Sequence, residues 1–289
     1  MPPNFYAGDG GERVTVDELL RAAAARLERS GDLDAGADAR WLLCGCLGCN
    51  SSWLRFSAPP DEAGQARYWA MVERRAAGEP LQYILGDQPF CGRSFHTDAR
   101  ALIPRPETEE LCLKALELIR GVTRPDVLDV GTGTGVLAVT IALERTDARV
   151  VGVDISSEAL ELARENAQAL GAQVELCLGD LYAPVSGRAF DMIVSNPPYL
   201  SACDMEQLQR EVRREPALAL FGGEDGLDVY RRLAQGAATM LKPGGHIALE
   251  VGAGQAGDVC ALLGPEFEDK GICRDINGVE RIVYARRVG

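Results

Sequence analysis

The pattern of hydrophobic and polar positions divides the chain into two regions. The first 85 or so residues show amphipathic helical patterns. Thr15-Val16-Asp17-Glu18 is a capping box, and it predicts the start of a helix that runs to Leu27. A second helix is expected over Ala35–Leu47, and a third from Pro59-Pro60-Asp61-Glu62 toward Ala77. Short helices joined by short loops predict a small helical bundle.

The pattern changes near Gly86. Residues Gln88–Ile103 carry isolated apolar side chains among glycine and polar residues, which predicts a β-hairpin linker. From about Pro106 onward, short apolar runs alternate with helical segments or loops. These runs are Val127–Val130, Val150–Val153, Val174–Leu178, Met192–Val194 and Ile247–Val251. Such alternation predicts a parallel sheet covered by helices on both faces.

The end of the chain predicts an antiparallel hairpin. Ile272–Ile276 and Arg281–Ala285 flank Asn277-Gly278, a strong hairpin-turn pair. A mostly parallel, seven-stranded sheet that ends in such a hairpin resembles the class I (Rossmann-like) S-adenosylmethionine methyltransferase fold. The predicted organisation is an N-terminal helical domain over residues 1–86, a hairpin linker over 87–104 and an α/β domain over 105–289.

Length and composition fit two soluble globular domains. The chain has 289 residues, of which 46% are hydrophobic and 25% are charged. The longest apolar runs, such as Val136–Leu143, are too short for a bilayer, which needs about 20 residues. Met1–Gly10 does not have the pattern of a secretory signal. The nine scattered cysteines favour reduced thiols. We therefore expect a cytoplasmic protein without a membrane partner.

The formal net charge of −13 bears on the choice of ligand. An acidic surface repels phosphate backbones, so direct nucleic-acid binding is not expected. The same charge suits a cationic ligand.

A glycine-rich loop marks the candidate cofactor site. The strand ending at Val130 runs into Gly131-Thr132-Gly133-Thr134-Gly135, and a helix is expected to begin near Val136. Glycines at such a turn let a ligand approach the backbone closely. A dinucleotide fingerprint would place its third glycine at position 136, and the carboxylate of Asp129 would repel a pyrophosphate. That carboxylate would instead attract the ammonium group of S-adenosyl-L-methionine, so the loop predicts this cofactor.

Two further carboxylates follow neighbouring strands. Asp154 ends the second strand and could accept both ribose hydroxyls, or cap the helix that begins near Ser156. Asp180 follows the third strand and could accept the adenine amino group, or be an ordinary turn residue. Leu181 would cover the adenine ring. Acidic residues at the carboxyl ends of consecutive strands lie where open α/β sheets bind ligands.

The candidate acceptor site follows the fourth strand. Phe190–Ser195 leads into Asn196-Pro197-Pro198-Tyr199, which two prolines hold in a stiff, extended conformation. Methylation of a planar NH2 group needs such a corner. The Asn196 side-chain oxygen and the Pro197 carbonyl would each accept one N–H, and Tyr199 would stack on the amide plane. Positioning and preorganised dipoles would supply the rate, without a metal.

Several longer segments carry a resemblance to a known family. They are Glu79-Pro80-Leu81-Gln82-Tyr83-Ile84-Leu85-Gly86, Leu102-Ile103-Pro104-Arg105-Pro106-Glu107-Thr108-Glu109, the glycine loop from Asp129, Asn196-Pro197-Pro198-Tyr199 and Leu220-Phe221-Gly222-Gly223-Glu224-Asp225-Gly226-Leu227. With these segments the chain resembles the HemK/PrmC family of peptide-chain release factor glutamine methyltransferases. Cys91 and Leu181 stand where this family usually has aromatic residues.

The resemblance implies methylation of the glutamine in the Gly-Gly-Gln motif of class 1 release factors, with S-adenosyl-L-homocysteine as the second product. It implies cofactor contacts from Gly131 to Gly135, Asp154, Leu181 and Asn196, and glutamine contacts from Asn196 to Tyr199. The helical domain would dock the release factor.

Four alternatives remain at this point. The corner would also suit an adenine or cytosine amino-methyltransferase acting on nucleic acid, and a ribosomal-protein glutamine methyltransferase is a sister possibility. From a different class, a nicotinamide-dependent oxidoreductase is opposed by Val136 and Asp129, and an inactive binding module stays open.

For several other polar residues, a structural role is expected or remains open. Cys44, Cys46 and Cys49 would point in different directions from one helix and predict thiols rather than a metal site. Lys242-Pro243-Gly244-Gly245 predicts a turn before the fifth strand, with a structural His246. Arg105 is expected either to order the linker or to touch the site, and Glu250 to lie either at the core edge or in the pocket.

Overall fold

The computed structural model describes residues 14–289, which fall into two compact units. The first unit comprises the described residues up to Gly86 together with Arg210–Arg214. The second comprises Asp87–Gln209 and Glu215–Gly289. The expectation about Met1–Gly10 concerns residues outside the described range. Within residues 14–289, no helix is both long enough and apolar enough to cross a membrane.

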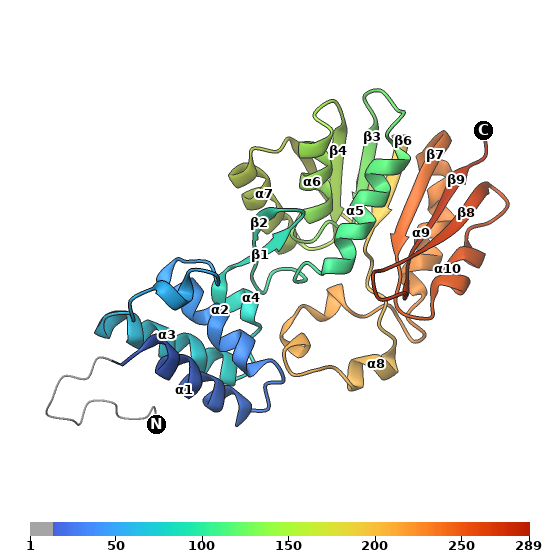
Figure 1. The fold of residues 1–289 in the computed structure, drawn as a ribbon. Coiled ribbons are helices and arrows are strands. Elements are labelled where there is room, and N and C mark those ends of the chain that lie inside the picture. Colours follow the sequence, from blue (N-terminus) through green and yellow to red (C-terminus); the bar gives the residue numbers. More distant parts are fainter. Residues whose placement is uncertain (1–13) are drawn as a thin grey trace, which may run out of the picture. The chain divides into compact units, whose positions relative to one another are not determined.

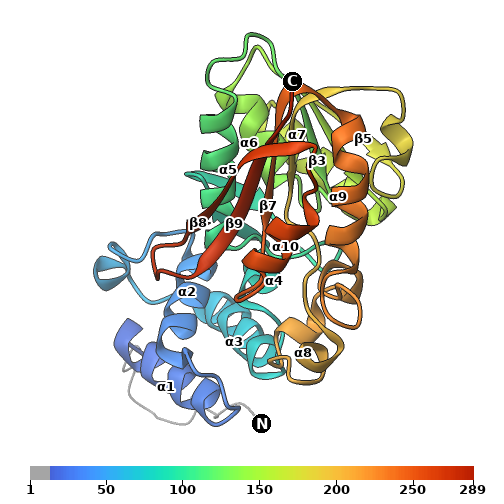
Figure 2. The same cartoon turned by 90° about the vertical axis from the view of Figure 1, so that its right-hand side faces the viewer.

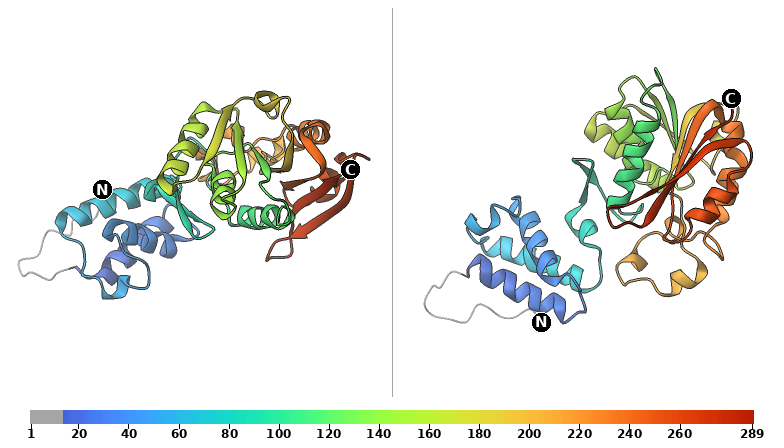
Figure 3. Two further views of the ribbon diagram at one scale, coloured as in Figure 1. Left: turned by 90° about the horizontal axis from the view of Figure 1, so that it is seen from above. Right: turned by 45° about the vertical axis from the view of Figure 1, so that its right-hand side comes forward.

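The first unit is helical (Figures 1 and 3). Its elements are α1 (Val16–Glu28), α2 (Ala35–Leu47), the 3₁₀ turn η1 (Leu54–Phe56), α3 (Glu62–Ala76) and α4 (Leu81–Leu85). Helix α1 begins where expected because the Thr15 hydroxyl accepts from the Glu18 N–H while the Glu18 carboxylate accepts from the Thr15 N–H. Helix α4 was not predicted, since five residues are too few to show a helical period.

A buried ion-pair cluster joins a distant segment to this unit. The Arg75 guanidinium contacts Asp38 at 2.5 Å, Asp32 at 3.1 Å and Glu211 at 2.8 Å. Glu211 belongs to the Arg210–Arg214 segment, which lies far along the chain from the helices. Breaking a buried pair leaves an uncompensated charge, so this cluster firmly ties the segment to the helical unit.

The second unit contains a seven-stranded sheet in the order β5-β4-β3-β6-β7-β9-β8 among its described residues. Its strands are β3 (Asp126–Val130), β4 (Arg149–Asp154), β5 (Val174–Leu178), β6 (Phe190–Ser195), β7 (Leu241–Glu250), β8 (Phe267–Arg274) and β9 (Glu280–Arg287). Neighbours from β5 to β7 pair in parallel, whereas β9 pairs antiparallel with both β7 and β8. The predicted fold class is confirmed.

Helices cover both faces of the sheet (Figure 2). One face carries α5 (Pro106–Leu118), α6 (Val136–Glu144) and α7 (Ser157–Leu170), and the other carries α9 (Asp228–Met240) and α10 (Ala256–Leu262). Successive side chains of β3 enter opposite cores: Val127 packs with residues of α5 and α6, and Leu128 with residues of α9 and α10. Burial on both faces explains the apolar runs of the central strands β3, β4 and β6, whereas the edge strand β5 has no buried residue. The shorter elements of this unit are α8 (Ala202–Glu206) and the 3₁₀ turns η2 (Ala183–Val185) and η4 (Ala217–Ala219), whereas the 3₁₀ turn η3 (Val212–Arg214) belongs to the first unit.

The hairpin after the first unit consists of β1 (Asp87–Phe90) and β2 (Arg93–His96), which pair antiparallel. Both strands end well before Ile103, so the hairpin is shorter than the predicted segment. It belongs to the second compact unit.

Two predicted boundaries near the end of the chain were wrong. Strand β7 begins at Leu241, so Lys242-Pro243-Gly244-Gly245 lies inside the strand instead of forming a turn before it. The pairing with β6 is irregular there, and the bulge takes up the extra residues. At the other end of the sheet, Ile276 lies outside β8, because Asp275 begins the turn by accepting the N–H of Asn277.

Candidate active site

The glycine loop between β3 and α6 has the backbone that only glycine adopts readily. Gly131, Gly133 and Gly135 have φ angles of +73°, +55° and +83°. A Cβ at Gly135 would lie 3.1 Å from the Cβ of Ala163 in α7. The glycines therefore set the shape of the loop and also let α7 pack close to it.

Hydrogen bonds join the carboxyl ends of the four neighbouring strands β5, β4, β3 and β6. They run from Gly179 N to Asp154 O at 2.9 Å, from Gly131 N to Val153 O at 2.8 Å, and from Ser195 Oγ to Val130 O at 2.6 Å. The glycine loop, the loop after β5 and the Asn-Pro-Pro-Tyr corner therefore leave the sheet at the same edge. This is the edge at which open α/β sheets bind ligands.

Asp129 is fully buried beside the loop. Its Oδ2 accepts from the Thr132 hydroxyl at 2.7 Å and from the Ala138 N–H at 3.2 Å. Its Oδ1 is buried and has no hydrogen-bond partner within the described chain. Burial raises the pKa of Asp129 to about 7. A buried carboxylate oxygen without a partner is costly, and it fits a cationic donor such as an ammonium group.

Asp154 helps to shape the loop. Its Oδ2 accepts from the Gly133 N–H and its Oδ1 from the Ser156 N–H, both at 2.9 Å. Burial raises its pKa. Each oxygen keeps acceptor capacity, which suits a pair of hydroxyl groups. The N-cap of α7 is Ser156 itself, so the capping role considered for Asp154 belongs to its neighbour.

Asp180 and Leu181 follow β5. The Asp180 carboxylate forms an ion pair with Arg232 on α9, and both side chains are about half exposed. A ligand at Asp180 would share the carboxylate with this arginine, which the sequence analysis did not anticipate. Leu181 has a φ angle of +48° and packs against the core between the sheet and helices α9 and α10.

The acceptor corner contains a connected chain of side chains. The Asn196 Nδ2 donates to Thr108 Oγ1 at 3.1 Å, and the Thr108 hydroxyl donates to Glu250 Oε2 at 2.7 Å. The remaining amide oxygen, Asn196 Oδ1, is buried and unpartnered among residues 14–289. Burial raises the pKa of Glu250 to about 7. Glu250 is buried at the end of β7 and is linked to the corner through Thr108.

The glycine-rich segment after α8 packs directly on this corner. The Gly222 N–H donates to the Leu200 carbonyl at 2.9 Å. A Cβ at Gly222 would lie 2.6 Å from the Pro198 carbonyl oxygen, and a Cβ at Gly226 would lie 2.4 Å from that of Tyr199. Both approaches are too close for any side chain, so only glycine at these two positions lets the Leu220–Leu227 segment pack against the corner.

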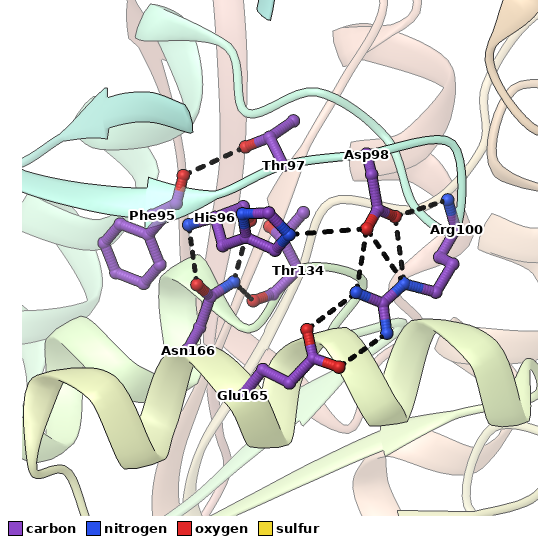
Figure 4. Close-up of polar contacts among 8 residues, drawn as sticks. All are labelled: Phe95, His96, Thr97, Asp98, Arg100, Thr134, Glu165 and Asn166. Carbon is purple, nitrogen blue, oxygen red and sulfur yellow. Dashed lines mark hydrogen bonds and ion pairs between the residues drawn. The ribbon is translucent and has the colours of Figure 1, made fainter. Parts of the chain in front are cut away.

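A buried asparagine links the hairpin to the glycine loop (Figure 4). Asn166 of α7 accepts from the His96 N–H at 2.7 Å, and its Nδ2 donates to the carbonyls of His96 at 3.0 Å and Thr134 at 2.9 Å. Beside it, Arg100 forms ion pairs with Asp98 and Glu165. Asn166 was not among the predicted site residues, because a single asparagine in an amphipathic helix gives no local signal of this role.

The remaining candidates have structural partners. Arg105 pairs with Glu215, whose other oxygen accepts from the Ile103 N–H at 3.0 Å, so Arg105 orders the linker. Cys91, in the turn of the hairpin, has a φ angle of +46° and donates its N–H to Glu109.

The clustered cysteines of α2 have ordinary surroundings. Cys44 is buried, and the Cys46 thiol donates to the Gly64 carbonyl. Cys49 lies outside α2, which ends at Leu47, and its thiol interacts with that of Cys44, so the prediction that the three cysteines point in different directions from one helix was wrong. In the described part of the chain, no group of three or more histidine, cysteine, aspartate or glutamate side chains is arranged to hold a metal.

The sheet order, the glycine loop after β3 and the polar corner after β6 define an S-adenosylmethionine-dependent methyltransferase. Residues 109–215 match the family described as Methyltransferase small domain, and residues 18–86 match PrmC N-terminal domain. The chain belongs to the release factor glutamine methyltransferase family.

Three individual proteins illustrate this placement. A release factor glutamine methyltransferase from Deinococcus radiodurans is 46% identical over 96% of this chain and 100% of its own length. One from Koribacter versatilis is 42% identical over 95% and 99%. The crystal structure of a methyltransferase from Pyrococcus furiosus shares the fold with a TM-score of 0.52, at 17% identity over 78% of this chain and 98% of that one.

Proposed function

We propose that this enzyme methylates the side-chain amide nitrogen of the glutamine in the Gly-Gly-Gln motif of class 1 peptide-chain release factors. The names of its full-length relatives support this substrate. The observation that carries the chemistry is the buried Asn196 Oδ1, an acceptor at the ligand-binding edge of the sheet that has no partner within residues 14–289. The relatives' names do not favour nucleic acid or a ribosomal protein as the substrate.

The cofactor-binding residues in this proposal surround the glycine loop. They are Asp129, Gly131, Thr132, Gly133, Thr134, Gly135, Asp154, Asp180, Leu181 and Asn196. Asp129 would take the ammonium group through its free oxygen, and Asp154 the ribose hydroxyls through its remaining lone pairs. When bound, S-adenosylmethionine supplies a methyl group to the amide nitrogen, which gives up one proton, and S-adenosylhomocysteine remains.

The corner would hold the acceptor nitrogen. An amide nitrogen is a poor nucleophile because its lone pair is delocalised into the carbonyl. In the proposed mechanism, Asn196 Oδ1 and the Pro197 carbonyl each accept one of its N–H bonds, and Tyr199 stacks on the amide plane. Two acceptors select an NH2 group, since a carboxylate has no proton to offer either of them. Pro198 would keep the corner rigid, so that orientation and fixed dipoles lower the barrier.

The helical domain over residues 1–86 would dock the release factor, with the 87–104 hairpin connecting it to the catalytic domain over 105–289. Two aromatic side chains of the helical unit, Trp53 and Phe56, are 63% and 66% exposed. Exposed aromatic residues suit a protein partner. The proposed reaction involves no metal, membrane or nucleic acid and takes place in the cytoplasm.

The test uses S-adenosylmethionine labelled in its methyl group. The purified enzyme is incubated separately with a class 1 release factor, the same factor carrying alanine in place of the motif glutamine, total RNA, and ribosomal proteins. We expect label only in the release factor that retains its motif glutamine. Label in the alanine variant, in RNA or in a ribosomal protein would overturn the substrate assignment. Calorimetry with S-adenosylhomocysteine and NAD would separately exclude an oxidoreductase.

A further inference from the structure

We propose that Thr108 and Glu250 are positioning residues that determine which end of the Asn196 side-chain amide faces the substrate. The inference rests on the proposed function, because it explains why Asn196 presents its oxygen to an NH2 group. Neither residue is required to touch the substrate or the reacting atoms.

The Thr108 hydroxyl has a single proton to donate. An ionised Glu250 can only accept hydrogen bonds, so the single hydroxyl proton of Thr108 goes to Glu250 Oε2. The Thr108 oxygen then has only lone pairs to offer Asn196. The amide group must therefore turn its Nδ2 toward Thr108, and its Oδ1 points the other way, without a partner in the described chain.

Without this chain, the orientation of Asn196 would be poorly determined. The terminal torsion of asparagine is broad and roughly two-fold, so sterics alone hardly distinguish the two orientations. A half-turn would present Nδ2 in place of Oδ1. Two NH2 groups would then face each other, and the acceptor amide would lose one of its two hydrogen bonds.

The two positioning residues lie on rigid elements. Thr108 is in the first turn of α5, and Glu250 is the last residue of β7; both are 2% exposed. The buried Tyr230 hydroxyl donates to the Glu250 backbone carbonyl at 2.7 Å and fixes the end of the strand. Because Thr108 and Glu250 are shielded, water does not readily replace either hydrogen bond when one partner is lost.

The chain of hydrogen bonds also makes Asn196 sensitive to pH. Burial raises the pKa of Glu250 to about 7, and the negative charge of Glu107 raises it further, whereas the Thr108 hydrogen bond and the charges of Arg281 and Arg105 lower it. Tyr199 and Tyr230 also face this carboxylate, and their own pKa values are raised mainly by burial.

The protonation state of Glu250 determines how kcat should change with pH. Above about pH 7, Glu250 is ionised and accepts from Thr108, which is the productive arrangement. Below it, protonated Glu250 can donate to Thr108, whose own proton is then free to point at Asn196. That reversal favours the wrong amide orientation, so kcat for the release factor should fall as the pH falls through this range.

The test compares Thr108→Ser, Thr108→Val and Glu250→Gln with the wild-type enzyme between pH 6 and 9. Serine keeps the hydroxyl, and we expect a kcat within roughly three-fold of wild type. Valine keeps the shape but removes the hydroxyl, and kcat should fall about 10- to 100-fold, as for loss of a preorganised polar group. The Kd for S-adenosylhomocysteine should change less than roughly three-fold in both. Glutamine can still accept from Thr108 without titrating, so Glu250→Gln should keep part of the activity and lose the step near pH 7.

The outcomes separate the two proposals. A wild-type enzyme that leaves the release factor unlabelled refutes the proposed function. With an active wild type, equal kcat values for Thr108→Ser and Thr108→Val overturn the positioning role, as does a parallel loss of S-adenosylhomocysteine binding in the valine variant. If Thr108→Val does not fold, Glu250→Gln decides: a wild-type pH profile in that variant overturns the inference.

Discussion

Replacing Asn166 by alanine should destabilise the second unit and loosen its glycine loop. The side chain makes three hydrogen bonds, to the N–H and carbonyl of His96 and to the carbonyl of Thr134, and is 1% exposed. Alanine would leave all three backbone groups without their partner. Because Thr134 lies in the glycine loop, the damage should reach the cofactor site.

The three hydrogen bonds set the size of the expected loss in stability. At about 1 kcal/mol net for each hydrogen bond, the loss amounts to roughly 3 kcal/mol in the free energy of unfolding. With a urea m-value of about 3 kcal/mol/M, the unfolding midpoint of the second unit should shift by about 1 M toward lower urea. The Kd for S-adenosylhomocysteine should rise in the same variant.

The position of the tryptophans helps the measurement. Trp41, Trp53 and Trp69 all lie in the helical unit, so tryptophan fluorescence reports on that unit. Hydrogen exchange of the β3 and β4 amides follows the second unit. We expect Asn166→Ala to lower the protection of these amides while leaving the fluorescence transition largely unchanged.

Gln168→Ala is the matched control, because Gln168 lies on the same helix and is exposed. Its unfolding and its S-adenosylhomocysteine affinity should remain at wild-type values. If Asn166→Ala behaves like this control in both measurements, the Asn166 hydrogen bonds contribute neither to the stability of the second unit nor to cofactor binding, and the prediction is wrong.

Three further predictions concern the site itself. Asn196→Ala should leave S-adenosylhomocysteine binding mostly intact by calorimetry but lower turnover about 10²-fold or more, and unchanged turnover would contradict the amide clamp. Gly222→Ala should also lower kcat, because its Cβ would lie 2.6 Å from the Pro198 carbonyl oxygen, whereas Gly257→Ala, with open space around its Cβ, should not. For Asp129, burial raises the native pKa to about 7, above the ordinary aspartate pKa of 3.8. The native state therefore keeps a proton that the unfolded state has lost, and the free energy of unfolding falls as the pH rises from about 4 to 7, by on the order of 4 kcal/mol at most. Cofactor-free Asp129→Asn should lack this component, and identical pH dependence in urea titrations of the two proteins would show that Asp129 does not contribute it.

Local chemistry in the sequence determined many elements of the fold. The start of α1 follows from the capping box at Thr15, and the start of α6 from the glycines that end at Gly135. The strands from β3 to β6 are apolar runs that could be recognised without knowing their neighbours. The Asn-Pro-Pro-Tyr corner is equally local, because each proline restricts its own φ angle and the conformation of the preceding residue.

Partners far apart in the sequence were decided only by the tertiary structure. Asp180 meets an arginine 52 residues away, Asn166 binds His96 across 70 residues, and Thr108 contacts Asn196 and Glu250 across 88 and 142 residues. The pairing of β6 with β7 in the sheet brings Asn196, which follows β6, close to Glu250 at the end of β7. Propensities and motifs act over a few residues, whereas the alignment of a hydroxyl with one particular carboxylate depends on how sheet and helices pack. The sequence alone therefore indicated the ligand-binding edge and its chemistry. Packing determined that the Asn196 amide directs its nitrogen to Thr108 and leaves its oxygen without a partner among the described residues.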